Sequence, residues 1–241
     1  LDVPQIIKEY SSDRAFTADG AALASHNYSF SSSVYSAAKV LDSIPDPTHI
    51  NEVCEIRKGS QYTISKFQNQ ISETPTDYQI LTSVNIQNDT VDFDSLPYIK
   101  GDEKLIKFKL EEGDLVVTTK STVVKTYVAH DLPDRHIIVT GGMIIVRPDK
   151  SKMNATYLKM FLDSEVGKSE LASIAQGAVI VSISLTAFEK DLIVPCPSIE
   201  KQNELANKYN NQLMMINGME KQIVELRNQL DNMFDESMEE S

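Results

Sequence analysis

The chain has 241 residues and a formal net charge of −12, and its 41% hydrophobic and 24% charged residues are typical of a soluble globular protein with one sizeable domain plus extra elements, or two small domains. No apolar run approaches the ~20 residues of a membrane-spanning helix, and the first ten residues have neither the basic start nor the apolar core of a signal peptide. Cys54 and Cys196 are far apart and outside any CxxC pattern, which argues against a disulfide framework or zinc site and makes a reducing cytoplasm the simplest expectation.

The acidic charge taken alone argues against nucleic-acid binding. The acids are unevenly distributed, however, because residues 115–130 contain Lys120 and Lys125 and no Asp or Glu. We therefore expect local positive patches on an acidic body. A plain acidic, solvated surface is the alternative.

Residues 1–44 mix short apolar pieces with Ser-rich stretches and are predicted to be an N-terminal segment or linker. The sequence IPDPTHI at 44–50 contains two prolines and an Asp, which favour a turn or the entrance to a domain. We expect a globular domain at residues 45–197.

Residues 50 to about 150 are predicted to be mostly strand. VCEIRKG is a short alternating run, and YQILTSVNIQNDTVDF predicts two strands joined by an Asn-Asp turn. In LIKFKLEEGDLVVTT, Ile106, Phe108 and Leu110 alternate with lysines, which predicts a hairpin that turns at Glu-Gly-Asp. KTYVAHD and HIIVTGGMIIVRP add further strands, with Gly141–Gly142 as a bend or bulge.

Helix is predicted from residue 154. Asn154 is the expected N-cap of ATYLKMFLDSEVGKSELASIA, whose apolar residues keep helical spacing, and Gly177 is the expected C-cap. AVIVSIS then predicts a strand, LTAFEKD a short turn or helix, and LIVP a last strand. Strands with few helices in this order indicate an α+β domain with a mixed sheet.

The Pro-Cys-Pro sequence at 195–197 cannot continue a strand ladder or enter a helix interior, so it predicts a sharp boundary. Ser198 is a good N-cap for a long coiled-coil helix at 198–236, followed by a disordered tail at 237–241. Apolar residues then recur every seven positions in two series, broken only by Gln212, as in the seam of a coiled coil. We expect this seam to bind another helix through Leu205, Tyr209, Ile216, Met219, Ile223, Leu226, Leu230 and Met233. A helix folded back on its own domain is the alternative.

No catalytic motif is found. The four histidines form no HExxH, and no GxSxG, P-loop or GxGxxG occurs. The sequence NYSF at 27–30 lacks both prolines of the Asn-Pro-Pro-aromatic motif of amino-methyltransferases, and no glycine-rich cofactor loop precedes it. The sequence therefore indicates a binding module with no catalytic and no metal-ligating residues.

Three segments in order resemble the specificity subunits of type I restriction–modification systems. LEEGDLVVTTKSTVVKTYVA at 110–129 is similar to a hairpin of their target-recognition domains. The stretch at 155–206 is similar to the closing half of that domain, where a Pro-x-Pro segment opens a long helix, and INEVCEIRKG at 50–59 is similar to its start. The family usually has a Glu-Gln pair after Pro-x-Pro, whereas here Lys201 separates Glu200 from Gln202.

The resemblance implies a target-recognition domain at 45–197 that reads a DNA half-site in the major groove without catalysis. It implies that the long helix docks methyltransferase (modification) subunits, which would bind S-adenosylmethionine themselves, so that this chain needs no cofactor. A restriction subunit, a second specificity half or a second copy are further expected partners, and no membrane is expected. The C-terminal specificity part of a fused DNA adenine methyltransferase, or a coiled-coil adaptor without a DNA role, are the alternatives.

Two segments combine DNA-binding chemistry with loop-like positions. Lysines and arginines suit phosphates, Gln suits adenine edges, Tyr suits stacking, and Ser and Thr bond to bases or to backbone. The residues expected to contact DNA are Arg57, Lys58, Gln61, Tyr62, Lys66, Lys120, Ser121, Thr122 and Lys125. Ordinary solvated strand ends are the alternative for each of them.

Overall fold

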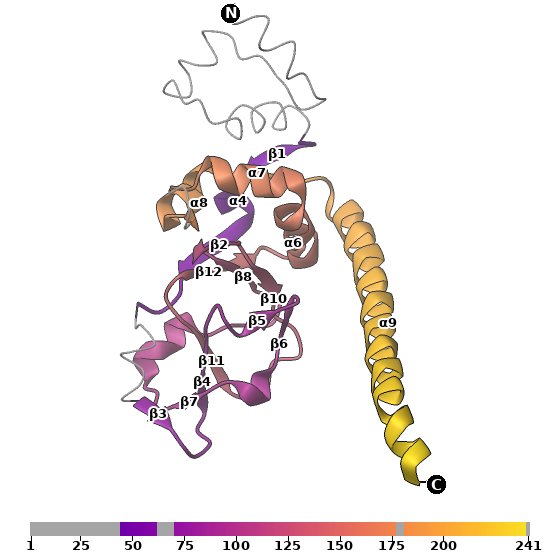
Figure 1. Ribbon diagram of the computed structural model, residues 1–241. Helices are drawn as coiled ribbons and strands as arrows, with labels where there is room; N and C mark the ends of the chain where they lie inside the picture. Colours follow the sequence, from indigo (N-terminus) through magenta and orange to yellow (C-terminus); the bar gives the residue numbers. More distant parts are fainter. Residues whose placement is uncertain (1–43, 62–69, 177–180, 240–241) are drawn as a thin grey trace, which may run out of the picture.

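The computed structural model describes residues 44–61, 70–176 and 181–239. The predicted N-terminal segment, up to residue 43, and the two predicted DNA-contact residues Tyr62 and Lys66 lie outside the described residues. The described part consists of two four-stranded sheets, three two-stranded pairs, a layer of helices and one long C-terminal helix (Figure 1). No helix among the described residues has the length and apolar character that crossing a membrane requires.

The first sheet is antiparallel and supports the helices. Its four strands, in spatial order, are β10 (Thr126–Val128), β8 (Leu115–Thr118), β12 (Met143–Pro148) and β2 (Cys54–Lys58). One face of this sheet packs on a helical layer through a shared core that includes Val117, Ile144, Leu158 and Phe188. That layer contains α4 (Ile50–Val53), α6 (Ala155–Asp163), α7 (Glu165–Ser173) and α8 (Leu185–Asp191).

The second sheet packs on the other face of the first. Its strands, in spatial order, are β11 (His136–Val139), β4 (Tyr78–Leu81), β7 (Tyr98–Ile99) and β3 (Ile71–Ser72). Strands β11 and β4 run parallel, so the domain contains a mixed sheet as predicted. A second core between the two sheets joins Val116 and Ile145 of the first to Leu81 and Ile137 of the second.

Three small strand pairs complete the domain. The hairpin of β5 (Ile86–Gln87) and β6 (Thr90–Val91) turns at Asn88 and Asp89, whose φ angles of 48° and 61° are typical of the tight turn that the Asn-Asp sequence predicted. The short 3-10 turn η2 (Phe93–Ser95) follows. Strand β9 (Lys120–Ser121) pairs with β13 (Val181–Ser182). Strand β1 (Pro47–His49) pairs with β14 (Ile193–Pro195), which brings the first described strand next to the last one.

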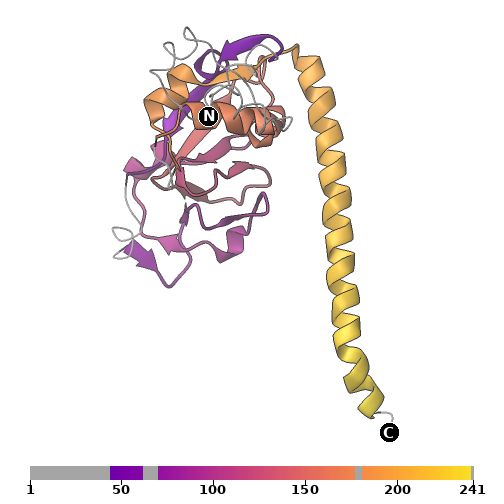
Figure 2. The ribbon, with the colours of Figure 1, turned by 45° about the horizontal axis from the view of Figure 1, so that its top comes forward.

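The long helix α9 (Ile199–Glu239) contains 41 residues, and at 1.5 Å per residue it extends about 62 Å. The Ser198 Oγ accepts a hydrogen bond from the Lys201 amide at 3.4 Å, so Ser198 caps the helix as expected. The helix includes residues 237–239, which we expected in a disordered tail, because nothing after residue 218 is a Gly or Pro that would end it. Figures 1 and 2 show the helix leaving the domain near α6 and standing beside it.

Two predicted elements differ from the structure. Residues expected to form a strand before the Glu-Gly-Asp turn instead form the 3-10 helix η3 (Glu103–Phe108), because Asp102 caps it and Leu105 and Phe108, three residues apart, pack on the same small core. The predicted helix after Asn154 is broken into α6 and α7. Ser164 has extended backbone angles there, and its Oγ accepts a hydrogen bond from the Gly167 amide at 3.1 Å, so it caps a new helix.

Candidate nucleic-acid interface

The two predicted DNA-contact segments meet at one end of the first sheet. The Gly59 amide donates to the Met143 carbonyl at 2.9 Å, and the Thr119 amide donates to the Gly142 carbonyl at 2.7 Å. Since β12 lies between β2 and β8, the chain after each of these strands emerges on either side of the Gly141–Gly142 turn. We call this surface the glycine end; it is formed by residues 58–61, 119–122, 140–143 and 181–183.

A third contributor, formed by Gln176 and residues 181–183, was not predicted. Ser182 pairs with Lys120 across β13 and β9, and the Ile183 amide donates to the Thr119 carbonyl at 2.9 Å. Ser182 also exchanges two backbone hydrogen bonds with Gln176, both at 2.9 Å. The chain before α8 therefore adds polar groups next to Lys120.

The segments that meet at the glycine end are free of acids over long stretches. Although the chain has 35 acidic residues, none falls within residues 56–72, 115–130, 135–148 or 171–188. Each stretch supplies part of the glycine end through the strand pairings given above. This end of the domain is thus better suited to phosphate groups than the net charge suggests.

Four of the predicted contact residues are exposed on this end: Lys58, Gln61, Lys120 and Thr122. Within the three described ranges, neither lysine ammonium has an acidic partner. Both ammonium groups are therefore available to a ligand without breaking an ion pair. Ser121 is half-buried, and its Oγ accepts a hydrogen bond from the Val123 amide at 3.4 Å.

The two kinds of glycine at this end differ in their surroundings. A Cβ at Gly59 would lie 2.3 Å from the Thr140 carbonyl oxygen, so this glycine allows two chain segments to pack closely. At Gly142 the φ angle is +91°, and an added Cβ would meet nothing within 4 Å. Gly142 therefore presents bare backbone to solvent, which permits close approach of a ligand's own backbone.

Two predicted contact residues have partners inside the protein. The Lys125 Nζ donates to the carbonyls of Ser83, at 3.2 Å, and Ile86, at 2.8 Å, so it holds the loop before the β5–β6 hairpin. A phosphate contact by Lys125 would have to replace both bonds. The Arg57 Nε lies 3.1 Å from a Glu55 carboxylate oxygen, while its buried Nη2 has no hydrogen-bond partner among the described residues.

Charged groups at the opposite end of β12 are engaged with one another. The Arg147 Nε and Nη2 donate to the two carboxylate oxygens of Asp114 at 2.7 and 2.8 Å, and its Nη1 lies 2.8 Å from Glu111. The hydrogen bond to Asp114 raises the pKa of Arg147 above its ordinary value. Among the described residues, no group of three or more His, Cys, Asp or Glu side chains is placed to hold a metal ion.

The predicted helix seam divides into two parts. Leu205 packs against the core of its own domain, and the Tyr209 hydroxyl lies 3.3 Å from the Lys159 Nζ, so neither faces open solvent fully. From Ile216 onward the seam is exposed, and Ile216 and Ile223 keep 49% and 48% of their surface accessible. The exposed remainder consists of Met219, Leu226, Leu230 and Met233.

Comparison with known sequences finds a curated relative of the chain. No family model matches the chain. A curated relative from Methanocaldococcus jannaschii, named "Putative type I restriction enzyme MjaX specificity subunit", is 23% identical over 185 residues, which are 75% of this chain and 43% of the relative. The resemblance stated from the sequence is therefore confirmed.

Two solved structures share the fold. One, from a study of complex assembly and conformational transition of the type I R-M system, aligns with a TM-score of 0.57 and 13% identity over 95% of this chain and 53% of its own length. The HsdS subunit from Thermoanaerobacter tengcongensis aligns with a TM-score of 0.52 and 13% identity over 89% of this chain and 48% of its own. These alignments confirm the α+β fold class with a long C-terminal helix. The chain spans about half the length of the proteins it matches.

Proposed function

We propose that this chain is a non-catalytic DNA sequence-recognition module of a type I restriction–modification system, and that the glycine end is its DNA-contacting surface. The observation that carries the proposal is the convergence of four acid-free stretches on one end of a domain whose fold is that of specificity subunits. The same end carries two lysines that have no acidic partner among the described residues. Lysines would contact phosphates, while Gln61 and Thr122 would reach base edges in the major groove.

We further propose that the exposed part of the seam binds helices of methyltransferase subunits, with a restriction subunit or a second specificity half as additional partners in the same assembly. Exposed apolar residues at seven-residue spacing along about 20 residues are typical of a helix that lacks its partner. S-adenosylmethionine would belong to the methyltransferase. Such a complex would work on DNA in the cytoplasm.

The net charge of −12 has a consequence for the isolated chain. Its overall field repels DNA, so we expect weak, salt-sensitive binding by the chain alone. Tight binding then requires the methyltransferase partner, which would contribute further positive charge and contact area. Tight and sequence-specific binding by the isolated chain would contradict this part of the proposal.

The DNA-contacting surface is tested with the methyltransferase complex and a labelled duplex, by fluorescence anisotropy at several salt concentrations. Lys58→Ala/Lys120→Ala removes two unpaired ammonium groups, so the slope of log affinity against log salt should fall by about 2. The matched control Lys104→Ala/Lys107→Ala removes the same charge from η3, which is not one of the segments that form the glycine end, and should leave the slope unchanged.

The outcomes separate the alternatives. A parent complex that binds no DNA at any salt concentration would overturn the function and favour the adaptor without a DNA role. A parent complex that binds, with the slope unchanged by Lys58→Ala/Lys120→Ala, would keep the function but move the contact surface elsewhere.

The helix partner is tested by Ile216→Asp/Ile223→Asp, which places two charges in the exposed seam. We expect loss of association with the methyltransferase or of self-association, measured by sedimentation velocity, with the domain still folded. Asn211→Asp/Asn228→Asp adds the same two charges at exposed positions outside the seam and is the control. Equal sedimentation of both variants and the parent would show that the seam is not an interface.

A further inference from the structure

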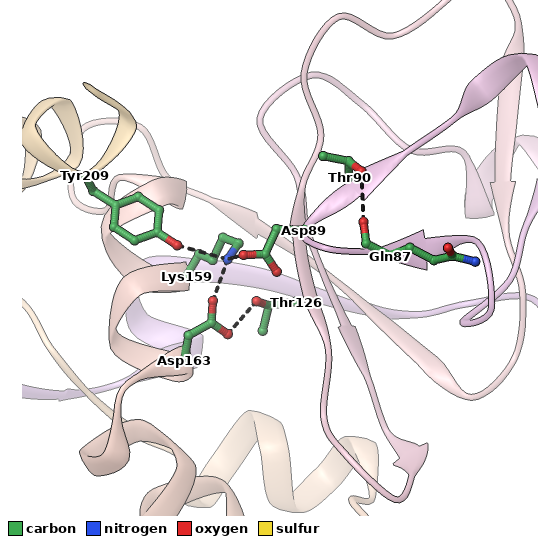
Figure 3. Close-up of polar contacts among 7 residues, drawn as sticks. All are labelled: Gln87, Asp89, Thr90, Thr126, Lys159, Asp163 and Tyr209. Carbon is green, nitrogen blue, oxygen red and sulfur yellow. Dashed lines mark hydrogen bonds and ion pairs between the residues drawn. The ribbon is translucent and has the colours of Figure 1, made fainter. Parts of the chain in front are cut away.

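A buried cluster around Lys159 joins three parts of the chain that are distant in sequence. The Lys159 Nζ, on α6, lies 2.5 Å from Asp163, 2.8 Å from Asp89 and 3.3 Å from the Tyr209 hydroxyl (Figure 3). Asp163 is one helical turn away on α6, Asp89 is in the turn of the β5–β6 hairpin, and Tyr209 is on α9. The cluster thus links a strand hairpin, the helical layer and the long helix.

The cluster holds a charge that must stay paired. Only 5% of the Lys159 side chain is exposed. Burial lowers the pKa of Lys159, but the hydrogen bonds and charges of Asp163 and Asp89 more than offset this effect, so that its pKa is raised. The ammonium therefore remains charged, and the Tyr209 ring lies over it with its centroid 5.7 Å from the nitrogen. Pulling Tyr209 away would leave one side of a buried ammonium without a partner.

The same cluster is linked to the chain that leads away from the glycine end. The Thr126 Oγ1 donates to the second oxygen of Asp163 at 2.6 Å (Figure 3). The preceding residue, Lys125, holds the loop before the β5–β6 hairpin through Ser83 and Ile86. The segment after Thr122 and the hairpin are therefore fixed to the same carboxylates that hold Lys159.

Side chains near the start of the long helix hold it on the domain, and they include Asn203, which accepts a hydrogen bond from the Asn154 Nδ2 at 2.8 Å, and Leu205, which packs against the core. At the first turn of the helix the fully buried Gln202 donates to the carbonyls of Lys152 and Pro197, both at 2.8 Å, and accepts from the Asn154 amide at 2.9 Å. Tyr209 follows seven residues later, about 10 Å along the helix axis. Among the described residues, it makes the last side-chain hydrogen bond from α9 to the domain. Beyond Tyr209, the ribbon of α9 stands apart from the domain (Figures 1 and 2). The seam residues from Ile216 to Met233 are exposed there.

We propose that Lys159 is a positioning residue which, through Tyr209, fixes the direction in which α9 leaves the domain. The contacts of Gln202, Asn203 and Leu205 hold the start of the helix. The Tyr209 contact, about 10 Å beyond Gln202, extends that hold along the axis and narrows the directions in which the rest of the helix can point. Asp89 and Asp163 keep the ammonium in place from the domain side. We call Lys159, Asp89, Asp163 and Tyr209 together the joint. Tyr209 therefore belongs to the joint and not to the seam for a partner helix.

The consequence for DNA recognition rests on the proposed function. The direction of α9 sets where its exposed seam lies relative to the glycine end. A partner on the seam and a DNA half-site on the glycine end are then held at a defined separation. Affinity for an isolated half-site should not depend on the joint.

The joint is tested by electron–electron spin-resonance distances in the full chain. Spin labels are placed at Glu103→Cys on η3 and Glu220→Cys on α9, in a Cys54→Ala/Cys196→Ser background that keeps the parent circular dichroism, and are diluted with unlabelled chain. The parent should give one narrow distance distribution. Lys159→Met should broaden it about twofold, because the ensemble of helix directions widens.

Two further variants make the result decisive. Tyr209→Ala removes the helix side of the joint and keeps the ion pairs of Lys159 with Asp89 and Asp163. It should therefore broaden the distribution even where Lys159→Met, which removes both ion pairs, fails to fold. Lys208→Met, the control, removes an exposed α9 lysine that pairs with Glu204 at 2.6 Å and should change nothing. A parent-like distribution in folded Tyr209→Ala would overturn the proposal.

A DNA measurement separates this inference from the proposed function. In the methyltransferase complex, Tyr209→Ala should bind a single half-site duplex with parent affinity. Complexes that bind no duplex at all would count against the proposed function and leave the distance result standing. Parent affinity together with a parent-like distance distribution would overturn only the joint.

Discussion

The two ends of strand β12 use charge in opposite ways. At its start, the glycine end carries Lys58 and Lys120, which have no acidic partner among the described residues. At its far end, Arg147 is held by Asp114 and Glu111, with Asp114 only 1% exposed. Both ends belong to the same antiparallel sheet and share its backbone pairing.

The difference separates stability from recognition. A charge that is buried and paired holds strands together, and its loss leaves the other charge unpaired. An exposed, unpaired lysine contributes little to stability, but it can exchange solvent for a phosphate without an internal cost. Mutations at the paired end should therefore affect folding, whereas those at the glycine end should affect binding.

The largest expected effect is at the paired end. Arg147→Met leaves the buried Asp114 carboxylate without its basic partner, although the Glu111 amide still donates to it at 2.8 Å, and should lower the free energy of unfolding by about 3–5 kcal/mol. Urea denaturation followed by circular dichroism measures this. Lys58→Met, on the strand next to β12, is the control and should change stability by less than about 0.5 kcal/mol. Equal effects of the two variants would remove the contrast between the ends.

Glu170 differs from Asp114, because it is a buried acid that has no basic partner among the described residues. It is 2% exposed in α7, and its Oε1 has no hydrogen-bond partner among the described residues. Burial raises the pKa of Glu170 to about 7, and a hydrogen bond from the Ile193 backbone only partly offsets this effect. Its carboxyl is therefore neutral in the folded protein at pH values where it is ionised in the unfolded chain.

The sign of the pH dependence follows. Below the ordinary pKa of a glutamate, Glu170 is protonated in both the folded and the unfolded state and does not lower the free energy of unfolding. As the pH rises toward 7, only the folded state keeps the proton, so the free energy of unfolding falls. Above pH 7 this loss is complete. Glu170→Gln should recover up to about 3 kcal/mol at pH 8 and little near pH 4.5. Urea denaturation at both pH values measures it. Glu165→Gln, exposed on the same helix, should show no such dependence.

The sequence predicts much of the fold because burial leaves a periodic signal. Strands β8, β11 and β12 each contain a run of buried apolar residues, and the Asn154 and Ser198 caps form as expected. At residues 103–108, alternating apolar residues and lysines predict a strand, but the structure has a 3-10 helix. Leu105 and Phe108 are three residues apart, and this spacing places both side chains on the same small core. Helical spacing likewise continues across Ser164, so it cannot reveal that this serine starts a new helix.

The candidate site is predicted only in part, for reasons of tertiary structure. Acid-free stretches are visible in the sequence, and extending that search to residues 171–188 would have found the third contributor. The acid-free stretches meet near Gly142 because β12 pairs with both β2 and β8. No local sequence pattern specifies this pairing. The direction of a side chain is also hidden, so Lys125 and Tyr209 fit their predicted patterns and yet contact their own domain.

A smaller effect is expected for a base contact at the glycine end. Gln61 is exposed next to the end of β2, and a Gln amide pairs with an adenine edge. In the methyltransferase complex, Gln61→Ala should cost about 1–3 kcal/mol on the cognate duplex and little on a scrambled one. Competition binding with both duplexes measures the difference. Equal loss on both would assign Gln61 to phosphate contact instead.

The smallest effect sharpens the comparison most, because it concerns one exposed charge. Lys120 sits on β9 opposite Ser182 and has no described ion pair, so Lys120→Ala should leave the unfolding free energy unchanged. As a phosphate contact, it should weaken binding to cognate and scrambled duplexes by the same factor and reduce the salt slope by about 1. Titrations of both duplexes at two salt concentrations test this. A loss confined to the cognate duplex would make Lys120 a base contact, and an unchanged slope would place it away from DNA.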